Sequence, residues 1–125
     1  MDIVISVTSE TPIYRQIYEQ VRAQILRGEL CSDACLPAIR TVAKELRISV
    51  ITIKKAWEEL ERQGLIYTIT GKGCFVAPMA AGALDVKRDA FVTERLDRDI
   101  AYYRSLGLGK EELIAYIERA FDGDQ

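Results

Sequence analysis

Residues 36–76 decide the fold, and they read LPAIRTVAKELRISVITIKKAWEELERQGLIYTITGKGCFV. Two short helical patterns come first in this stretch, and a hairpin pattern flanked by glycine follows them. That order predicts a winged helix-turn-helix, in which two helices meet at a tight turn and a β-hairpin, the wing, comes next. The expected fold class is therefore mainly α with a small β wing.

Apolar residues mark the buried side of each expected helix. The first helix has its set at Ile39, Val42, Ala43 and Leu46. The second, with spacing i, i+3, i+4 and i+7, has its set at Ile53, Ala56, Trp57 and Leu60. Ser49 can cap the second helix, and Gly64 ends it. Since the segment between Leu46 and Ser49 is so short, we expect the two helices to cross at a steep angle.

The wing is predicted from two β-prone runs, residues 65–70 and 74–77, that flank Gly71-Lys72-Gly73. Glycine permits the tight turn, so a hairpin with a cationic tip is expected. Lys72 and Gly73 are candidates to reach the minor groove of DNA, because glycine allows a close approach of the backbone. The alternative is a turn lysine that contacts nothing.

Residues 3–7, ahead of this stretch, alternate in polarity and indicate a short strand or an extended arm. Thr11 as a cap and Pro12 in the first turn predict a helix that Gly28 stops. Its apolar positions are Ile13, Ile17, Val21 and Ile25. Tyr14, Tyr18 and Trp57 lie at helical spacing and are expected in the core, not as stacking platforms.

The last third of the chain reads as an appendage. Residues 79–84 are small and flexible, which indicates a linker between a winged domain, 1–78, and a tail, 85–125. Two helical patterns in the tail have an apolar stripe at Leu96, Ile100, Tyr103, Leu113, Ile117 and Phe121. Two helices of this size cannot enclose a core, so we expect the stripe to pack on a second copy of the chain.

The composition fits one domain with an appendage, with 125 residues of which 49% are hydrophobic. No segment resembles a membrane span or a signal peptide, so we expect a cytoplasmic protein with no membrane contact. The net charge is −2, but residues 36–74 alone sum to +3. Positive charge is therefore concentrated in the stretch that decides the fold.

Catalysis is not expected. The chain has no histidine, which removes the commonest general base, and it has no phosphate-binding glycine loop. No cofactor or metal is expected. Cys31, Cys35 and Cys74 are an odd number, which argues against a disulfide framework, and they are interpreted as small hydrophobes. A thiol- or metal-responsive site built from them is the alternative.

The side of the second helix opposite its apolar set carries the candidates for DNA contact. With the two positions at the helix start and Lys54 on the flank, they are Ser49, Val50, Ile51, Thr52, Lys54 and Lys55. Recognition helices present their first turns to base edges, so Ile51 and Thr52 are candidates for direct readout. An exposed isoleucine suits a thymine methyl group, and Lys54 and Lys55 suit phosphates. In the alternative, Ile51 packs against a loop or the wing, and the lysines form a solvated face.

Several short motifs in this order resemble the GntR family of bacterial transcription factors. The motifs are Pro12-Ile13-Tyr14, Gln16-Ile17, Gly28-Glu29-Leu30, Leu36-Pro37, Arg40, residues 46–52, Glu59-Leu60-Glu61, Gly64-Leu65-Ile66, Gly71-Lys72-Gly73 and Phe75-Val76. The opening motif and the short tail are similar to the YtrA-type subfamily. The resemblance implies a dimeric repressor that dimerises through its tail, with Arg40 in contact with DNA.

The chain departs from the family pattern at four places. They are Ser32-Asp33 in place of Pro-Gly, Arg47 in place of the turn glycine, Val50-Ile51 in place of polar or basic residues, and Tyr67-Thr68-Ile69-Thr70 on the wing strand. These changes do not alter the expected fold, but they fall on positions that would read the operator.

The hypothesis drawn from the sequence is a dimeric, sequence-specific repressor that binds a palindromic double-stranded DNA operator. One alternative is a winged protein-interaction module without DNA binding, which the acidic total and Val50-Ile51 would suit. A small-molecule effector is possible, and with so short a tail it would bind at the dimer seam or between domains.

Overall fold

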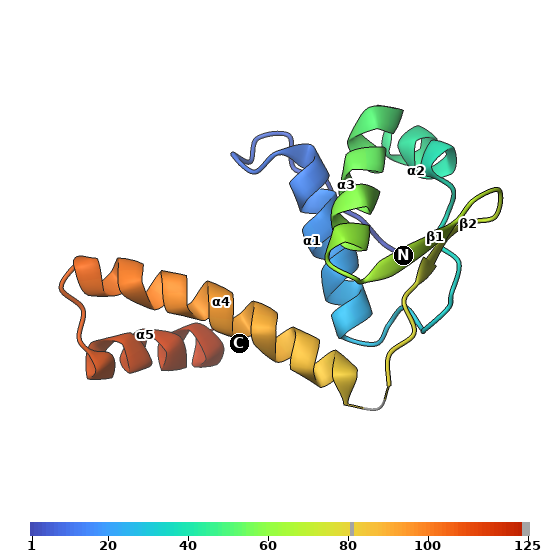
Figure 1. Ribbon diagram of the computed structural model, residues 1–125. Coiled ribbons are helices and arrows are strands. Elements are labelled where there is room, and N and C mark those ends of the chain that lie inside the picture. The colour runs from blue at the N-terminus through green and yellow to red at the C-terminus, as the bar shows by residue number, and fades with distance from the viewer. Residues whose placement is uncertain (81, 124–125) are drawn as a thin grey trace. The chain divides into compact units, whose positions relative to one another are not determined.

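The computed structural model describes residues 1–80 and 82–123. The elements, in chain order, are α1 (Ile13–Leu26), α2 (Ile39–Leu46), α3 (Val50–Arg62), β1 (Ile66–Ile69), β2 (Gly73–Val76), α4 (Ala83–Ser105) and α5 (Lys110–Asp122) (Figure 1). The chain divides into two compact units, Met1–Asp85 and Val86–Gln125. The first unit is mainly helical with one small antiparallel sheet, which confirms the predicted fold class.

Helix α3 packs against α1 and α2, and its contact side forms the centre of the first unit. The four positions predicted from the apolar spacing are all buried: Ile53, Ala56, Trp57 and Leu60. Helix α1 contributes Ile17, Tyr18, Val21 and Ile25, each at most 1% exposed. A long amphipathic helix thus meets a second one along matching apolar stripes, as the periodicity predicts.

The turn between α2 and α3 is tight, as expected. Arg47 ends α2 in the left-handed region with a φ of 57°. Two residues later, Ser49 begins α3 as its N-cap, and its Oγ accepts a hydrogen bond of 3.2 Å from the backbone N–H of Thr52. The Ser49 cap is confirmed, and Arg47 occupies a conformation that glycine adopts more cheaply.

Strands β1 and β2 form the expected hairpin, with Ile66 opposite Val76. The segment before α2 adds a third strand position to the sheet, because Cys35 pairs with Phe75 in an antiparallel bridge. The N–H of Leu36 donates to the carbonyl of Cys74 at 2.8 Å, and the N–H of Val76 donates to that of Ala34 at 2.9 Å. The wing is therefore anchored along β2 to the chain segment that leads into α2.

The start of α1 differs from the prediction. Pro12, not Thr11, is the N-cap, and no side chain caps the helix. Instead, the Pro12 carbonyl accepts hydrogen bonds from the backbone N–H groups of Arg15 and Gln16. The side-chain Nε2 of Gln16 donates to the Thr11 carbonyl at 2.8 Å. Because Pro12 takes the N-cap position, Thr11 lies one residue outside it and does not cap the helix.

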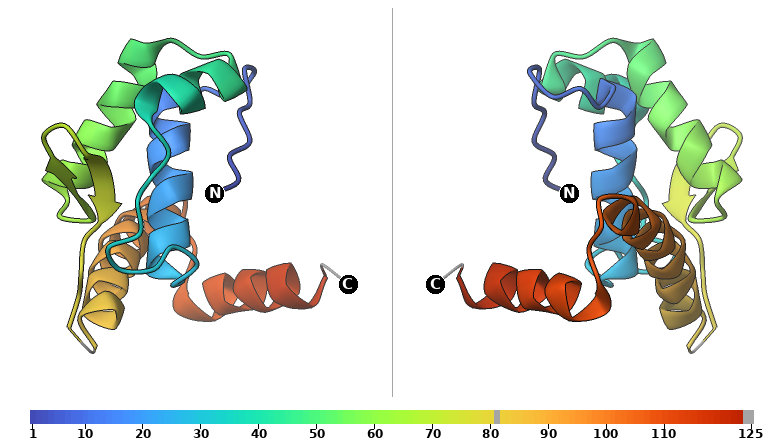
Figure 2. Two further views of the ribbon diagram at one scale, coloured as in Figure 1. Left: turned by 90° about the vertical axis from the view of Figure 1, so that its right-hand side faces the viewer. Right: turned by 90° about the vertical axis from the view of Figure 1, so that its left-hand side faces the viewer.

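The N-terminal residues form an extended arm that runs beside α1 (Figure 2). Three glutamine side chains of α1 hold the arm by its backbone. Gln20 Oε1 accepts from the Val4 N–H at 2.8 Å, and Gln20 Nε2 donates to the Val4 carbonyl at 2.7 Å. Gln16 makes the same pair of bonds to Ser6, and Gln24 donates to the Asp2 carbonyl.

This glutamine ladder depends on a match of two repeats. Four residues along a helix advance about 6 Å, and two residues along an extended chain advance about 6.6 Å. Glutamines spaced by four can therefore pair with backbone groups spaced by two. Of the two structures expected for residues 3–7, the extended arm is confirmed, because residues 1–6 form no strand.

The second unit is a pair of helices, α5 and most of α4. None of the residues of α4 and α5 is buried in the single chain. Helix α4 begins at Ala83, so Ala83 and Leu84, which we placed in the linker, are helical. Alanine and leucine are strong helix formers, and this preference extends the helix into the expected linker. Within the described residues, no helix is long and apolar enough to cross a membrane.

The glutamine ladder makes a testable prediction. Gln20→Leu removes both bonds to Val4, so we expect the Val4 amide to exchange its hydrogen markedly faster and the free energy of unfolding to fall by about 0.5–1.5 kcal/mol. Gln20→Glu is the matched control, because its carboxylate still accepts from the Val4 N–H but cannot donate, and it should give an intermediate exchange rate. Equal protection of Val4 in all three proteins, measured by NMR, would show that the ladder does not hold the arm.

Candidate nucleic-acid interface

The first turn of α3 carries two exposed apolar side chains. Ile51 is 78% exposed and Val50 is 39% exposed. The Ser49 and Thr52 hydroxyl groups lie 2.7 Å apart and are hydrogen-bonded to each other. The Ile51 side chain therefore projects into solvent. The two hydroxyl groups also face outward, but they are hydrogen-bonded to each other and stabilise the start of the helix.

The electrostatics of this helix start favour an anion. The first turn of α3 contains no acidic residue, so no carboxylate offsets the positive end of the helix dipole. Further along α3, Arg62 Nε donates to Glu59 Oε2 at 2.9 Å, and this bond is the main cause that lowers the pKa of Glu59 below its ordinary value. The acidic end of the helix is thus partly neutralised within the protein.

The structure gives Lys54 and Lys55 different surroundings. Both are exposed, but Lys55 Nζ lies 4.0 Å from the ring centroid of Tyr14, at the start of α1. This cation–π contact holds the ammonium group against α1. Tyr14 is half-buried, in contrast to Tyr18 and Trp57, which lie in the core as expected. Helical spacing alone did not reveal the role of Tyr14, because the contact joins two helices distant in sequence.

Arg40 is exposed on the first turn of α2. Lys72 and Gly73 are exposed at the turn of the wing, where the Lys72 N–H donates to the Ile69 carbonyl at 2.9 Å. Gly71 and Gly73 have φ values of 81° and 116°, which non-glycine residues rarely adopt. The turn that presents Lys72 therefore depends on both glycines.

These elements are neighbours in the first unit. Figures 1 and 2 show α2 and the first turn of α3 together at one end of the unit, and α3 also contacts β1 of the hairpin. The candidate DNA-contact residues of α2 and of the wing thus lie on elements that adjoin α3. The contact with Tyr14 directs Lys55 toward α1.

The three cysteines do not converge. All are free thiols. Cys35 pairs with Phe75, and Cys74 is the residue before Phe75 in β2, so Cys35 and Cys74 face opposite sides of the sheet. Within the described residues, no group of three or more metal-ligating side chains is close enough to hold a metal ion. The geometry gives the thiol-based metal site no support.

The outer side of the sheet carries a contact that the sequence analysis missed. The rings of Tyr67 and Phe75 stack with centroids 5.4 Å apart, and the Tyr67 hydroxyl donates to Asp33 Oδ1 at 2.8 Å. This hydrogen bond raises the pKa of Tyr67 above its ordinary value. Asp33 and Tyr67 are two of the positions at which the chain departs from the family pattern, and they contact each other.

Comparison with known proteins gives a consistent result. Residues 13–76 match the family described as bacterial regulatory proteins, gntR family. The HTH-type transcriptional repressor YtrA of Bacillus subtilis is 32% identical over 88% of this chain and 85% of its own length.

Two solved structures extend the comparison to three dimensions. A GntR family transcriptional regulator from Listeria monocytogenes superposes with a TM-score of 0.76 at 26% identity, over 89% of this chain and 96% of that one. The structure of AraR(DBD) in complex with operator ORX1 superposes with a TM-score of 0.55 at 29% identity, over 62% of this chain and 96% of that one. The chain belongs to the gntR family of bacterial regulatory proteins and is a DNA-binding transcriptional regulator of the kind that YtrA represents.

Proposed function

We propose that the protein is a homodimeric repressor that acts in the cytoplasm and binds a palindromic operator, with one winged unit on each half-site. The observation that carries the proposal is the first turn of α3. This turn is exposed and contains no acidic residue. It presents Ile51 close to Lys54 of the same helix, and the neighbouring α2 and wing carry Arg40 and Lys72.

The proposed contacts fall into two kinds. Ile51 and Thr52 read base edges in the major groove, with Ser49 and Val50 beside the backbone at the helix start. Arg40 and Lys54 neutralise phosphates of the DNA backbone. Lys72, next to Gly73, reaches the minor groove from the wing. Lys55 contacts the phosphates that flank α1, because the Tyr14 ring holds its ammonium group there.

The proposed dimer forms through the second unit. The apolar stripe remains accessible in the single chain, with exposed fractions of 47% for Leu96, 45% for Ile117 and 80% for Phe121. Tyr103, Leu113 and Ile117 also line a hollow of about 380 Å³ within this unit. Side chains of a second copy would fill the hollow and cover Ile100 and the rest of the stripe.

A protein-interaction module is the second candidate, and the exposed apolar pair Val50 and Ile51 favours it. The two candidates differ in their dependence on salt. Contacts with phosphate release counterions and weaken steeply with salt, whereas an apolar contact between proteins does not.

The first prediction concerns the operator itself. The full chain should bind a fragment from upstream of its own gene about 1,000-fold more tightly than a scrambled fragment of equal length, measured by fluorescence anisotropy across a salt series. Lys54→Ala removes one proposed phosphate contact from each protomer, so it should weaken binding to both fragments and reduce the salt slope by about two units. Lys110→Ala, which removes the same charge from α5, is the control. Equal affinity for both fragments would contradict the proposal.

The second prediction concerns base reading by Ile51. Replacing the thymines of the half-site with uracil removes only their methyl groups, and we expect the wild type to lose about fivefold or more in affinity. Ile51→Ala should lose a similar amount on the thymine operator and be insensitive to the replacement. Val7→Ala, at an equally accessible apolar residue of the arm, should behave as the wild type. If Ile51→Ala remains as sensitive as the wild type, Ile51 does not read the methyl group.

The third prediction concerns the tail. Sedimentation equilibrium should give twice the chain mass for the wild type and a single chain mass for Ile117→Asp, because the partner would bury an unpaired carboxylate. Ile117→Leu keeps the apolar surface and should remain dimeric. A dimer that persists in Ile117→Asp would place the interface elsewhere.

A further inference from the structure

A pocket within the first unit lies apart from the proposed DNA interface and apart from the dimer stripe. Its volume is about 380 Å³. The lining comes from the C-terminal end of α1, from the loop that follows α1, and from the segment between β2 and the first residues of α4. All of the lining residues belong to the first unit.

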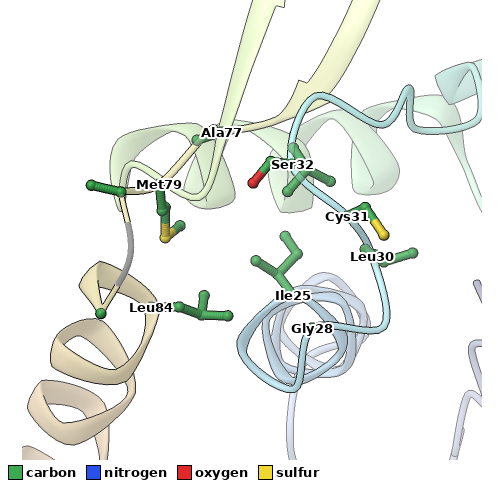
Figure 3. Close-up of a pocket in the computed structure, with 11 residues that line it drawn as sticks. Ile25, Gly28, Leu30, Cys31, Ser32, Ala77, Met79 and Leu84 are labelled. Atoms are coloured by element: carbon green, nitrogen blue, oxygen red, sulfur yellow. The ribbon is translucent and has the colours of Figure 1, made fainter.

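The side chains of this pocket converge on one space. Figure 3 shows Ile25, Ser32, Met79 and Leu84 directed toward the same space, whereas Cys31 turns its sulfur away. Ile25 forms a rigid floor, since it is only 1% exposed. Met79 and Leu84 are half-buried, and the thioether side chain of methionine adapts readily to different shapes.

The chemistry of the lining selects the kind of ligand. No Asp, Glu, Lys or Arg is among the described residues that line the pocket, so a charged molecule would lose its hydration without finding a counter-charge. The Ser32 hydroxyl supplies one donor and acceptor for orientation. The volume lies in the lower part of the range of small-molecule sites, with space for roughly a dozen groups the size of a water molecule.

The position of the pocket gives such a ligand a way to act. One wall is the segment that leads from β2 into α4, and it includes Met79 and Leu84. A ligand that binds one conformation of this segment more tightly than others shifts the population toward that conformation. If α4 and α5 form the dimer, the same segment sets how two winged units can be spaced on an operator.

We propose that this pocket is the site of an effector, and that the effector is a small, uncharged, largely apolar molecule. Binding changes operator affinity by fixing the segment between β2 and α4. The ligand site stands on the pocket alone. Its effect on DNA rests on the proposed function.

The test uses the only two methionines of the 125-residue sequence. Met79 lines the pocket and Met1 does not, so carbon-13 labelling of methionine methyl groups gives one reporter signal and one internal control. The probe is N-phenyl-1-naphthylamine, which is uncharged. Its sulfonated analogue, 8-anilino-1-naphthalenesulfonate, has the same skeleton with one negative charge.

We expect the uncharged probe to shift the Met79 signal saturably, the Met1 signal to remain in place, and the sulfonated analogue to shift Met79 at least about tenfold more weakly. Ser32→Phe fills the pocket and should abolish the Met79 shift. Cys31→Phe adds the same ring one residue earlier, where the side chain turns away, and should preserve it. The absence of a saturable shift, or an equal shift in Ser32→Phe, would overturn the site.

The link to DNA is measured separately. Saturating the wild type with the uncharged probe should change operator affinity about fivefold or more, and Ser32→Phe should show no change. A Met79 shift with unchanged operator affinity would overturn the regulatory role. If the protein fails to bind the operator at all, the proposed function fails, and the methyl signals still decide whether the pocket binds the uncharged probe.

Discussion

The burial of one side of α3 is the constraint on which the rest of the structure depends. Ile53, Trp57 and Leu60 are at most 2% exposed, and a helix that buries these positions must turn Ile51 and Lys54 outward. The contact is strong enough to tolerate a local cost. Trp57 Nε1 is buried without a hydrogen-bond partner among the described residues, and such a group costs about 1–3 kcal/mol. The packing of the large indole ring offsets that cost.

The turn before α3 allows α2 to pack on the same helix, and the residues Arg47 and Ser49 make this turn possible. The chain must reverse between Leu46 and Ser49 so that α2 can also pack on α3. Arg47 accepts the left-handed conformation that this reversal needs, at a cost of roughly 1–2 kcal/mol. Ser49 recovers part of it as a cap, typically about 1 kcal/mol. Arg47 thus places a residue with a side chain in a conformation that glycine adopts at lower energy.

The sequence predicted those features that depend on local patterns. The core side of α3, the Ser49 cap and the hairpin follow from apolar spacing, from side-chain chemistry near one helix end and from glycine. It did not predict contacts between distant residues. The Cys35 bridge to Phe75 gives no periodic signal, since one residue suffices for it. The glutamine ladder carries a visible repeat of four, but only the structure shows that the arm lies beside it.

The same distinction applies to the candidate interface. The exposure of Ile51 follows from helical geometry, so the sequence could identify it, whereas the contact between Lys55 and Tyr14 requires the packing of α1 on α3 to be known. The two lysines at positions 54 and 55 are adjacent in sequence, yet a helix places them about 100° apart, and only one of them meets an aromatic ring. The two adjacent lysines of α3 therefore do not act as a unit.

The net charge of −2 limits how this protein can hold DNA. Non-specific affinity grows with the number of phosphates neutralised, and one winged unit offers only a few cations for that purpose. In the proposed dimer, two linked units would change the balance, because the second unit would bind at a high effective concentration once the first is in place. Base reading then contributes a larger share of the total affinity than it does in a strongly basic protein. In the proposed dimer, the apolar tail thus raises DNA affinity by linking two winged units, and this compensates for the small number of cations on each unit.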